Sequence, residues 1–206
     1  MKSLLVAGRC CAVAGWIFWI LVQIVAKDPF PPEISMSQYG VGPDGWLFSV
    51  WVILLATGPL LLQFYRPVPG PARWLLIIGY LATWLLAIVR TDEGGLQMSA
   101  QAKVHMIGAI IALVCLPLGM LLALLRSRRP WRPLGLILGA AAVIAGTLVV
   151  LSAIGLDTAG IGAPASWALW EGTLTIIEML LVSAYALGVN TIEPVLERRQ
   201  PLAAPR

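Results

Sequence analysis

Six blocks of predominantly apolar residues, each about 20 residues long, limit most narrowly how this chain can fold. A helix of about 20 residues rises about 30 Å, which is the thickness of the hydrocarbon core of a bilayer. Inside that core every backbone polar group must be paired within the chain, and a helix pairs its own. The sequence therefore predicts an all-α integral membrane protein, a bundle of six transmembrane helices.

Short segments rich in proline, glycine and charged residues separate the blocks, and such segments end helices. We expect the spans at residues 4–26, 45–65, 73–89, 104–125, 134–154 and 166–188. The first block has no small-x-small cleavage site after its apolar run, so we expect a retained helix rather than a signal peptide. Residues 1–190 are then a single transmembrane domain, and residues 191–206 form a short cytoplasmic tail.

Lysines and arginines concentrate on one side of the predicted membrane. That side holds Lys2, Arg66, Arg73, Arg126, Arg128, Arg129, Arg132, Arg198, Arg199 and Arg206, and the other holds Lys27, Arg90 and Lys103. The positive-inside rule places both termini in the cytoplasm and accounts for the net charge of +4 without a nucleic-acid partner. Because no lipidation or organelle-targeting motif is visible, we expect a multi-pass protein of the bacterial plasma (inner) membrane.

The last predicted span carries two glutamates. Glu171 lies roughly 7 Å below one end of the helix and Glu178 roughly 18 Å, near the bilayer midplane. Seven residues apart, they share a helix face, with Thr175 between them. A charged acid at the midplane costs about 2.5–3.5 kcal/mol, so we expect Glu178 to be a neutral acid facing the bundle interior. A purely structural alternative has it hydrogen-bonded to Ser152 or Thr147 of the preceding span.

Two loop stretches carry a recognisable pattern, "EISMSQYGVGPDGW" at residues 33–46 and "RTDEGG" at residues 90–95. The residues that carry it are Ser37, Tyr39, Gly40, Gly42, Gly45 and Trp46, then Thr91, Asp92 and Gly95, then His105. Together with the six spans, they resemble the bacterial integral membrane proteins called domain-of-unknown-function family 998. The resemblance covers about residues 5–190 and implies no activity, because the family has none assigned.

The chain departs from the family pattern at one place, and several loop residues have simple structural explanations. The family shows a glutamate-arginine pair near the start of the last span, whereas Glu171 is followed here by Gly172. Either Asp44 or the Gly42–Pro43 corner would start the second span, and we expect Asp44 to cap that helix. Asp92 could form an interfacial ion pair with Arg90, which is worth about 0–1 kcal/mol.

Taken as a set, the acidic and histidine side chains on the side of the membrane away from the cytoplasm predict a polar opening above Glu178. Asp92, His105 and Glu171 would form it. One histidine cannot build a three-histidine zinc site or a two-histidine haem site, and the three cysteines lie inside apolar blocks without metal-binding spacing. Dinucleotide, phosphate and serine-hydrolase motifs are absent from the sequence. We therefore expect no cofactor, while a metal held by Asp92, His105 and Asp157 stays open as an alternative.

A neutral acid in an apolar site is suited to protonating an alkene or epoxide, and aromatic faces stabilise the resulting cation. The sequence thus favours a small, cofactor-independent membrane enzyme acting on an isoprenoid or lipid, of the terpene cyclase or isomerase type. Glu178 would be the acid, Glu171 or Asp92 would reprotonate or orient it, and His105 would remove the final proton. We expect substrate contacts from Tyr39, Trp46, Trp84, Trp167, Trp170 and Thr175.

Two other classes of function fit the same features. A midplane acid also serves proton-coupled small-molecule carriers, although residues 1–90 and 104–188 show no convincing repeat. A non-catalytic protein could bind a lipid or another partner through the loops that hold the acidic residues.

Overall fold

The computed structural model describes residues 2–26, 29–30, 35–95 and 99–192, and every regular element in these ranges is helical. Six helices are long and apolar enough to cross a membrane. They are α1 (Lys2–Val25), α2 (Gly45–Tyr65), α3 (Pro71–Ile88), α4 (Ala100–Leu124), α5 (Trp131–Ala153) and α6 (Ala163–Gly188), with the short helices η1 (Met36–Gly40), η2 (Glu93–Gly95) and η3 (Val189–Thr191). The six predicted spans are confirmed, while the predicted tail lies from residue 193 onward outside the described residues.

Several helices begin a few residues earlier than predicted, for local chemical reasons. Pro71 and Pro164 lie in the first turns of α3 and α6, where a missing N–H costs nothing. Ser99 caps α4 by accepting a hydrogen bond from the backbone N–H of Ala102. Asp44 does occupy the N-cap position of α2, but the expectation that its side chain caps the helix is wrong, because it makes no capping hydrogen bond.

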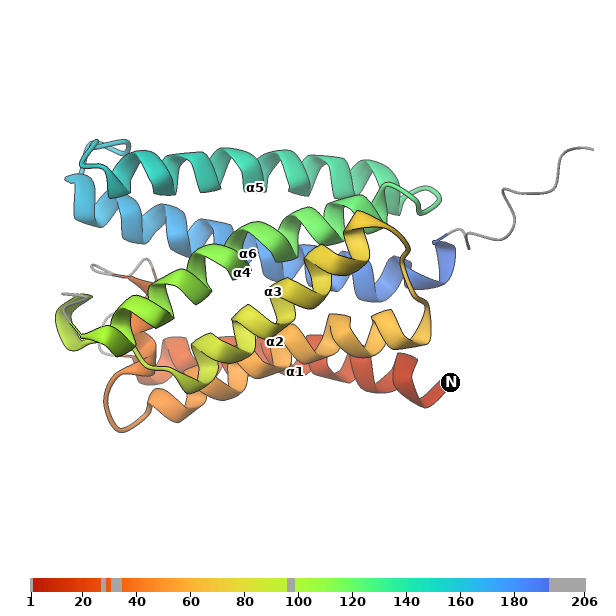
Figure 1. Cartoon of the computed structure of the whole chain (residues 1–206), viewed down its shortest axis with the longest axis horizontal. Coiled ribbons are helices and arrows are strands. Elements are labelled where there is room, and N and C mark those ends of the chain that lie inside the picture. Colours follow the sequence, from red (N-terminus) through yellow and green to blue (C-terminus); the bar gives the residue numbers. More distant parts are fainter. Residues whose placement is uncertain (1, 27–28, 31–34, 96–98, 193–206) are drawn as a thin grey trace, which may run out of the picture.

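Successive helices run antiparallel to one another, and neighbours in sequence pack as the pairs α1–α2, α3–α4 and α5–α6 (Figure 1). Helix α6 also contacts α1, α2 and α4, which makes it the central helix. In the most apolar stretch of α6, 67% of the residues are buried inside the bundle, whereas the corresponding share is 22% in α1 and in α5. Polar side chains on α6 are therefore the ones that the fold places inside the bundle.

The two ends of the bundle differ in which segments they hold (Figure 1). One end, called here the terminal end, holds the start of α1, the end of α6 and the α2–α3 and α4–α5 turns. The opposite end, called the η1/η2 end, holds η1, η2 and the α5–α6 turn.

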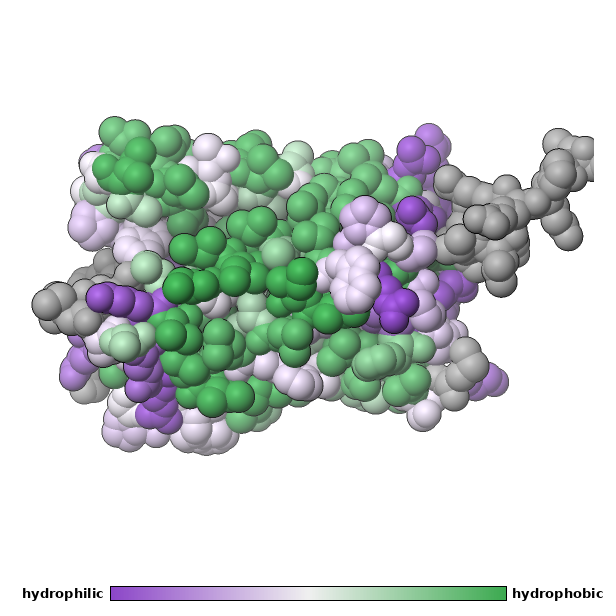
Figure 2. Space-filling model, in the orientation of Figure 1, coloured by the Kyte–Doolittle hydropathy of each residue, from purple (hydrophilic) through white to green (hydrophobic). Residues whose placement is uncertain are grey.

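A hydrophobic surface lies between these two ends. Figure 2 shows it as a band of apolar residues, with hydrophilic residues gathered toward both ends of the face in view. Large apolar side chains are exposed on all six helices. An apolar surface of this extent is unfavourable in water but matches the hydrocarbon core of a bilayer. The chain is therefore a multi-pass membrane protein.

Glycines allow the paired helices to approach closely. A Cβ atom on Gly79 of α3 would lie 2.7 Å from Leu116 Cγ, and one on Gly119 of α4 would lie 2.9 Å from Leu76 Cγ. Each leucine thus fills the space over the glycine of the facing helix. Such contacts dominate helix association in lipid, where apolar surface alone does not drive helices together.

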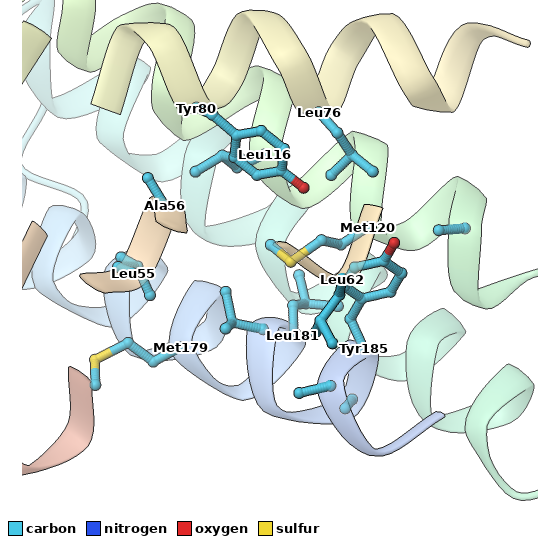
Figure 3. Close-up of a cluster of buried hydrophobic side chains, with 14 of the residues drawn as sticks. Leu55, Ala56, Leu62, Leu76, Tyr80, Leu116, Met120, Met179, Leu181 and Tyr185 are labelled. Atoms are coloured by element: carbon cyan, nitrogen blue, oxygen red, sulfur yellow. The ribbon is translucent and has the colours of Figure 1, made fainter. Parts of the chain in front are cut away.

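Toward the terminal end the interior is filled by close-packed side chains (Figure 3). Those almost fully buried include Leu62, Leu76, Leu116, Met120, Leu181 and Tyr185. The Tyr185 hydroxyl donates to Gln63 Oε1 at 3.3 Å, and the Gln63 amide in turn exchanges two hydrogen bonds with the Val68 backbone.

Two arginines hold the end of α6 in place. Arg9 Nε of α1 donates to the carbonyl of Ala186 at 3.0 Å, and Arg66 Nη1 donates to the carbonyl of Asn190 at 2.9 Å. The last carbonyls of a helix lack partners within the helix and carry its negative dipole end, so cations stabilise them. The contact of Arg9 with the Ala186 carbonyl explains why a charged residue occurs within the first span.

Candidate functional site

The polar face of α6 points into the bundle. Glu171, Thr175 and Glu178 are only 8%, 7% and 4% exposed. They lie along one face of a helix that is itself surrounded by four others. Both carboxyl groups are therefore surrounded by protein rather than by lipid.

These side chains border a cavity of about 60 Å³, called here the acid cavity. Glu171 and Glu178 line it from α6, His105 from α4, Trp51 from α2, and Ser37 from η1. A volume of this size holds one or two water molecules, at about 30 Å³ each. It is several times smaller than the roughly 300–1,000 Å³ of sites that enclose a whole drug-sized ligand.

Two polar atoms on the acid cavity have no hydrogen-bond partner among the described residues. They are Oε1 of Glu178 and Nε1 of Trp51, and both are buried. More than nine in ten buried polar groups in folded proteins are paired, so an unpaired carboxyl oxygen and an unpaired N–H on one cavity call for an explanation. A donor and a carboxyl facing the same space can together hold a small polar or unsaturated group.

The structural partners expected for Glu178 are engaged elsewhere. The Ser152 hydroxyl is 2.7 Å from the Thr158 hydroxyl, and the Thr147 hydroxyl donates to the carbonyl of Val143 at 2.8 Å. The alternative in which one of these hydroxyls pairs with Glu178 is therefore wrong for this structure.

Glu171 connects α6 to the η1/η2 end. Its Oε2 accepts a hydrogen bond from the backbone N–H of Met36, the first residue of η1, at 3.2 Å, and Thr175 donates to its carbonyl. The glycine that replaces the expected arginine at position 172 has a packing reason. A Cβ on Gly172 would lie 2.5 Å from Cε2 of Phe30, so no larger side chain fits there while that ring is in place.

His105 is buried in the second turn of α4 with its Nδ1 against the carbonyl of Val89, at the end of α3. A carbonyl can only accept, so Nδ1 carries the hydrogen in this contact. The neutral ring then keeps Nε2 as a proton acceptor. His105 thus joins two helices and also offers a base to the acid cavity that it lines.

Asp92 is not among the residues that line the acid cavity. Its carboxylate accepts from the backbone N–H of Ser99 at 2.8 Å and from the Ser99 hydroxyl at 2.6 Å. The Asp92 carbonyl accepts from the Gln38 amide, whose oxygen accepts from the Gly94 N–H. Of the three residues expected to form the polar opening, the structure thus brings together His105 and Glu171, while Asp92 organises the turn between α3 and α4.

The six residues expected to contact a substrate lie in different places. Thr175 lines the acid cavity. Trp46 and Trp84 are on the surface, 53% and 37% exposed. Trp170 Nε1 donates to the Thr158 hydroxyl at 2.9 Å.

The remaining two, Tyr39 and Trp167, lie near the η1/η2 end. The Tyr39 hydroxyl is 3.5 Å from Gln23 Oε1. Trp167 lines a separate cleft of about 320 Å³ together with Ser35, Ser37 and Thr91. Because Ser37 lines both spaces, this cleft lies next to the acid cavity.

The aromatic rings that do line the acid cavity are Phe48 and Trp51 of α2, neither of which was among the expected substrate contacts. Their centroids are 5.6 Å apart in an edge-to-face arrangement. Helix α2 is apolar almost all round, so no polar stripe marks the face that meets α6.

The metal-binding alternative is not assembled in the described part of the chain, where no three histidine, cysteine or acidic side chains gather. Asp157 lies in the α5–α6 turn, where the backbone N–H of Gly162 and the hydroxyl of Ser166 donate to it and lower its pKa to about 2. His105 and Asp92 have the separate partners already described.

Comparison with known proteins places the chain by family alone. No curated protein and no solved structure matches it. The family model described as "Protein of unknown function (DUF998)" matches residues 10–188, from within α1 to the end of α6. The chain therefore belongs to the DUF998 family.

Proposed function

We propose that this protein is a small, cofactor-independent membrane enzyme that uses buried carboxyl groups for acid-base chemistry on an isoprenoid or other unsaturated lipid. The observation that carries the proposal is the pair of unpaired atoms on the acid cavity, Oε1 of Glu178 and Nε1 of Trp51. A carboxyl group near the midplane with no structural partner has a cost, which a substrate contact would offset.

The proposed reaction moves a carbon–carbon double bond. Glu178, as a neutral acid, donates its proton to one alkene carbon, and the cation that forms is stabilised by the ring faces of Phe48 and Trp51. Nε2 of His105 then takes a proton from a neighbouring carbon, which forms the new double bond. Return of that proton to Glu178 through water in the acid cavity restores the enzyme, so product and substrate have the same formula.

The volume of the acid cavity supports isomerisation better than cyclisation. About 60 Å³ accepts the reacting end of a lipophile. Cyclisation requires the folded chain to be enclosed, and such ligands occupy sites of several hundred Å³. In this proposal Glu171 is a positioning residue, because it holds η1 over the cavity through the Met36 N–H.

A proton-coupled carrier receives less support. A carrier needs the site to open in turn toward both sides of the membrane. Between Glu178 and the terminal end, Met120, Leu181 and Tyr185 are almost fully buried in close packing.

We further propose that the terminal end faces the cytoplasm of a bacterial cell, in the inner membrane. The α2–α3 and α4–α5 turns at this end carry Arg66, Arg126, Arg128 and Arg129, in keeping with the positive-inside rule. Fusions of the C-terminus to green fluorescent protein and to alkaline phosphatase test this orientation. Fluorescence without phosphatase activity is expected, and the opposite pattern contradicts it.

The reaction is tested with purified protein in lipid nanodiscs, supplied with prenyl alcohols and prenylated quinone precursors in D2O. We expect an isomer of the substrate in which a deuterium from the solvent has replaced one hydrogen. Glu178→Gln should lower its formation by about 100-fold or more, the usual contribution of a general acid. Glu93→Gln is the matched control, because Glu93 is an exposed acid in η2.

Two outcomes oppose the proposal. Full activity in Glu178→Gln would remove this residue as the acid. Lipophiles recovered unchanged and without deuterium would favour the non-catalytic binding role instead.

A further inference from the structure

An apolar groove of about 440 Å³ runs between α4 and α5 on the surface that faces lipid. Val114 of α4 and Val143 of α5 form part of its rim and are 56% and 64% exposed. The hydroxyl of Thr147, the polar side chain among its lining residues, already donates to the carbonyl of Val143. The groove therefore offers hydrocarbon contact without a free polar group.

A glycine keeps the groove open. A Cβ atom on Gly146 would meet a single neighbour, Leu174 Cδ2 at 3.9 Å, whereas a Cβ on Gly139 would lie 2.7 Å from Leu121 Cδ1. Gly139 is thus required for close packing of α4 on α5, but Gly146 is not. Gly146 therefore leaves the space above it open without being needed for packing.

The groove adjoins the acid cavity. Leu113 of α4 lines both spaces. Leu174 forms part of the groove floor, three residues after Glu171 and four before Glu178, so it neighbours both acids on the surface of α6. The groove and the acid cavity are thus neighbouring spaces that share a lining side chain.

We propose that this groove binds a single hydrocarbon chain of a membrane lipophile, whose reacting end passes Leu113 into the acid cavity. The volume of the groove lies in the range of about 300–1,000 Å³ that is typical of ligand sites. The reacting end rests on the proposed function, whereas occupation of the groove does not require turnover. The substrate then enters sideways from the bilayer, and the small acid cavity needs to accept only its unsaturated end.

The test is photo-crosslinking with a prenyl alcohol that carries a diazirine in its chain, diluted in nanodiscs of saturated phosphatidylcholine. Labelled peptides are mapped by mass spectrometry in the wild type and in Gly146→Phe and Ala140→Phe. Ala140 is the matched control, because it is exposed on α5 and does not line the groove.

In the wild type we expect peptides of α4 and α5 at the groove to be labelled in excess over the exposed faces of α1 and α3. Gly146→Phe should lower this labelling about tenfold, the effect of excluding about two methylene groups from the groove. Ala140→Phe should label like the wild type, and Glu178→Gln enters only the separate test of activity. An excess of unlabelled prenyl alcohol should also abolish the groove labelling, which tests the site without any substitution.

Two results overturn the proposal: equal labelling of all lipid-facing helices, or labelling that free alcohol does not compete away. The enzyme proposal is judged separately. If the groove is labelled and the Glu178→Gln variant is active, the groove proposal stands and Glu178 is not the acid. If the wild type is active but the groove is not labelled, the groove proposal fails and the enzyme proposal stands.

Discussion

Along α6, the side chains on either side of Glu178 meet two different environments. Toward the terminal end, Leu181 and Tyr185 are almost fully buried against their neighbours, and the Tyr185 hydroxyl is hydrogen-bonded (Figure 3). Toward the η1/η2 end, Glu171 and Glu178 border a cavity, and one of their oxygens is unpaired. One half of α6 is thus closely packed against its neighbours, whereas the other half borders a cavity with polar side chains.

This difference separates the part of the interior that holds the fold from the part available for chemistry. Helices in lipid are held by close packing and by hydrogen bonds. Where Leu181 and Tyr185 lie, the side chains are closely packed and the Tyr185 hydroxyl is hydrogen-bonded, although the buried hydroxyl of Tyr80 has no partner among the described residues. A buried carboxyl oxygen without a partner costs stability rather than adding to it, and Oε1 of Glu178 is such an atom. Substitutions in the two halves should therefore have different consequences.

The largest effect is expected for Gly119→Leu in the packed half. A Cβ at this position would lie 3.0 Å from the backbone nitrogen of Leu76, which cannot move without shifting α3. Overpacking of this kind costs about 3 kcal/mol or more, so we expect loss of monodisperse protein in size-exclusion chromatography. Gly146→Ala is the control, because its Cβ has open space, and it should elute like the wild type. Normal elution of Gly119→Leu would contradict close packing of α3 on α4.

A sharper comparison uses two residues nearly one turn apart on α6. Leu181→Ala should destabilise the protein by about 2–4 kcal/mol, because it leaves a cavity in close packing. Glu178→Met should be neutral or stabilising, since it replaces a buried, unpaired carboxyl with an apolar chain of similar size. Thermal unfolding in detergent measures both. If Glu178→Met is the more harmful of the two, Glu178 is a structural residue after all.

The sequence could predict the helices of both halves but not the contrast between them. Apolar length and helix-breaking segments were sufficient to place all six spans, and the spacing of Glu171 and Glu178 placed them on one face. The partner of Glu171 is the backbone N–H of Met36, and a backbone group has no sequence signal. Gln38 joins η1 to η2 through a side chain that sequence reasoning treats as an ordinary loop residue.

Aromatic residues show the same limit. Trp84 was selected by residue type and position in a span, and Trp46 as part of the loop pattern, yet both are exposed on the surface. Trp51, which lines the acid cavity, belongs to a helix whose faces all have similar hydropathy. In a membrane protein the lipid-facing and interior surfaces are both apolar, so hydrophobic periodicity cannot tell which tryptophan faces inward.

A moderate effect is expected for Glu171→Ala, which tests how η1 is held over the acid cavity. Loss of the Met36 N–H contact removes one hydrogen bond, worth about 0.5–1.5 kcal/mol, so the Met36 amide should exchange up to about tenfold faster. Hydrogen–deuterium exchange of a peptide that covers η1 measures this. Glu178→Gln serves as the control and should leave that peptide unchanged. Equal exchange in the wild type and Glu171→Ala would show that η1 is held by other contacts.

The smallest effect is expected at Asp157, in the turn that joins α5 to α6 at the η1/η2 end. The Gly162 N–H and the Ser166 hydroxyl lower its pKa from 3.8 to about 2, so the folded state favours the charged carboxylate. This stabilisation is complete above about pH 4 and is lost as the pH falls toward 2, because the group then protonates in both states. The melting temperature of the wild type should exceed that of Asp157→Asn by a small margin at pH 5, and the margin should close by pH 2. In a Ser166→Ala background the difference in melting temperature between proteins without and with Asp157→Asn at pH 5 should be smaller, since the hydroxyl donor is gone. A margin that does not change with pH would mean that the turn is held by its backbone conformation rather than by the Asp157 carboxylate.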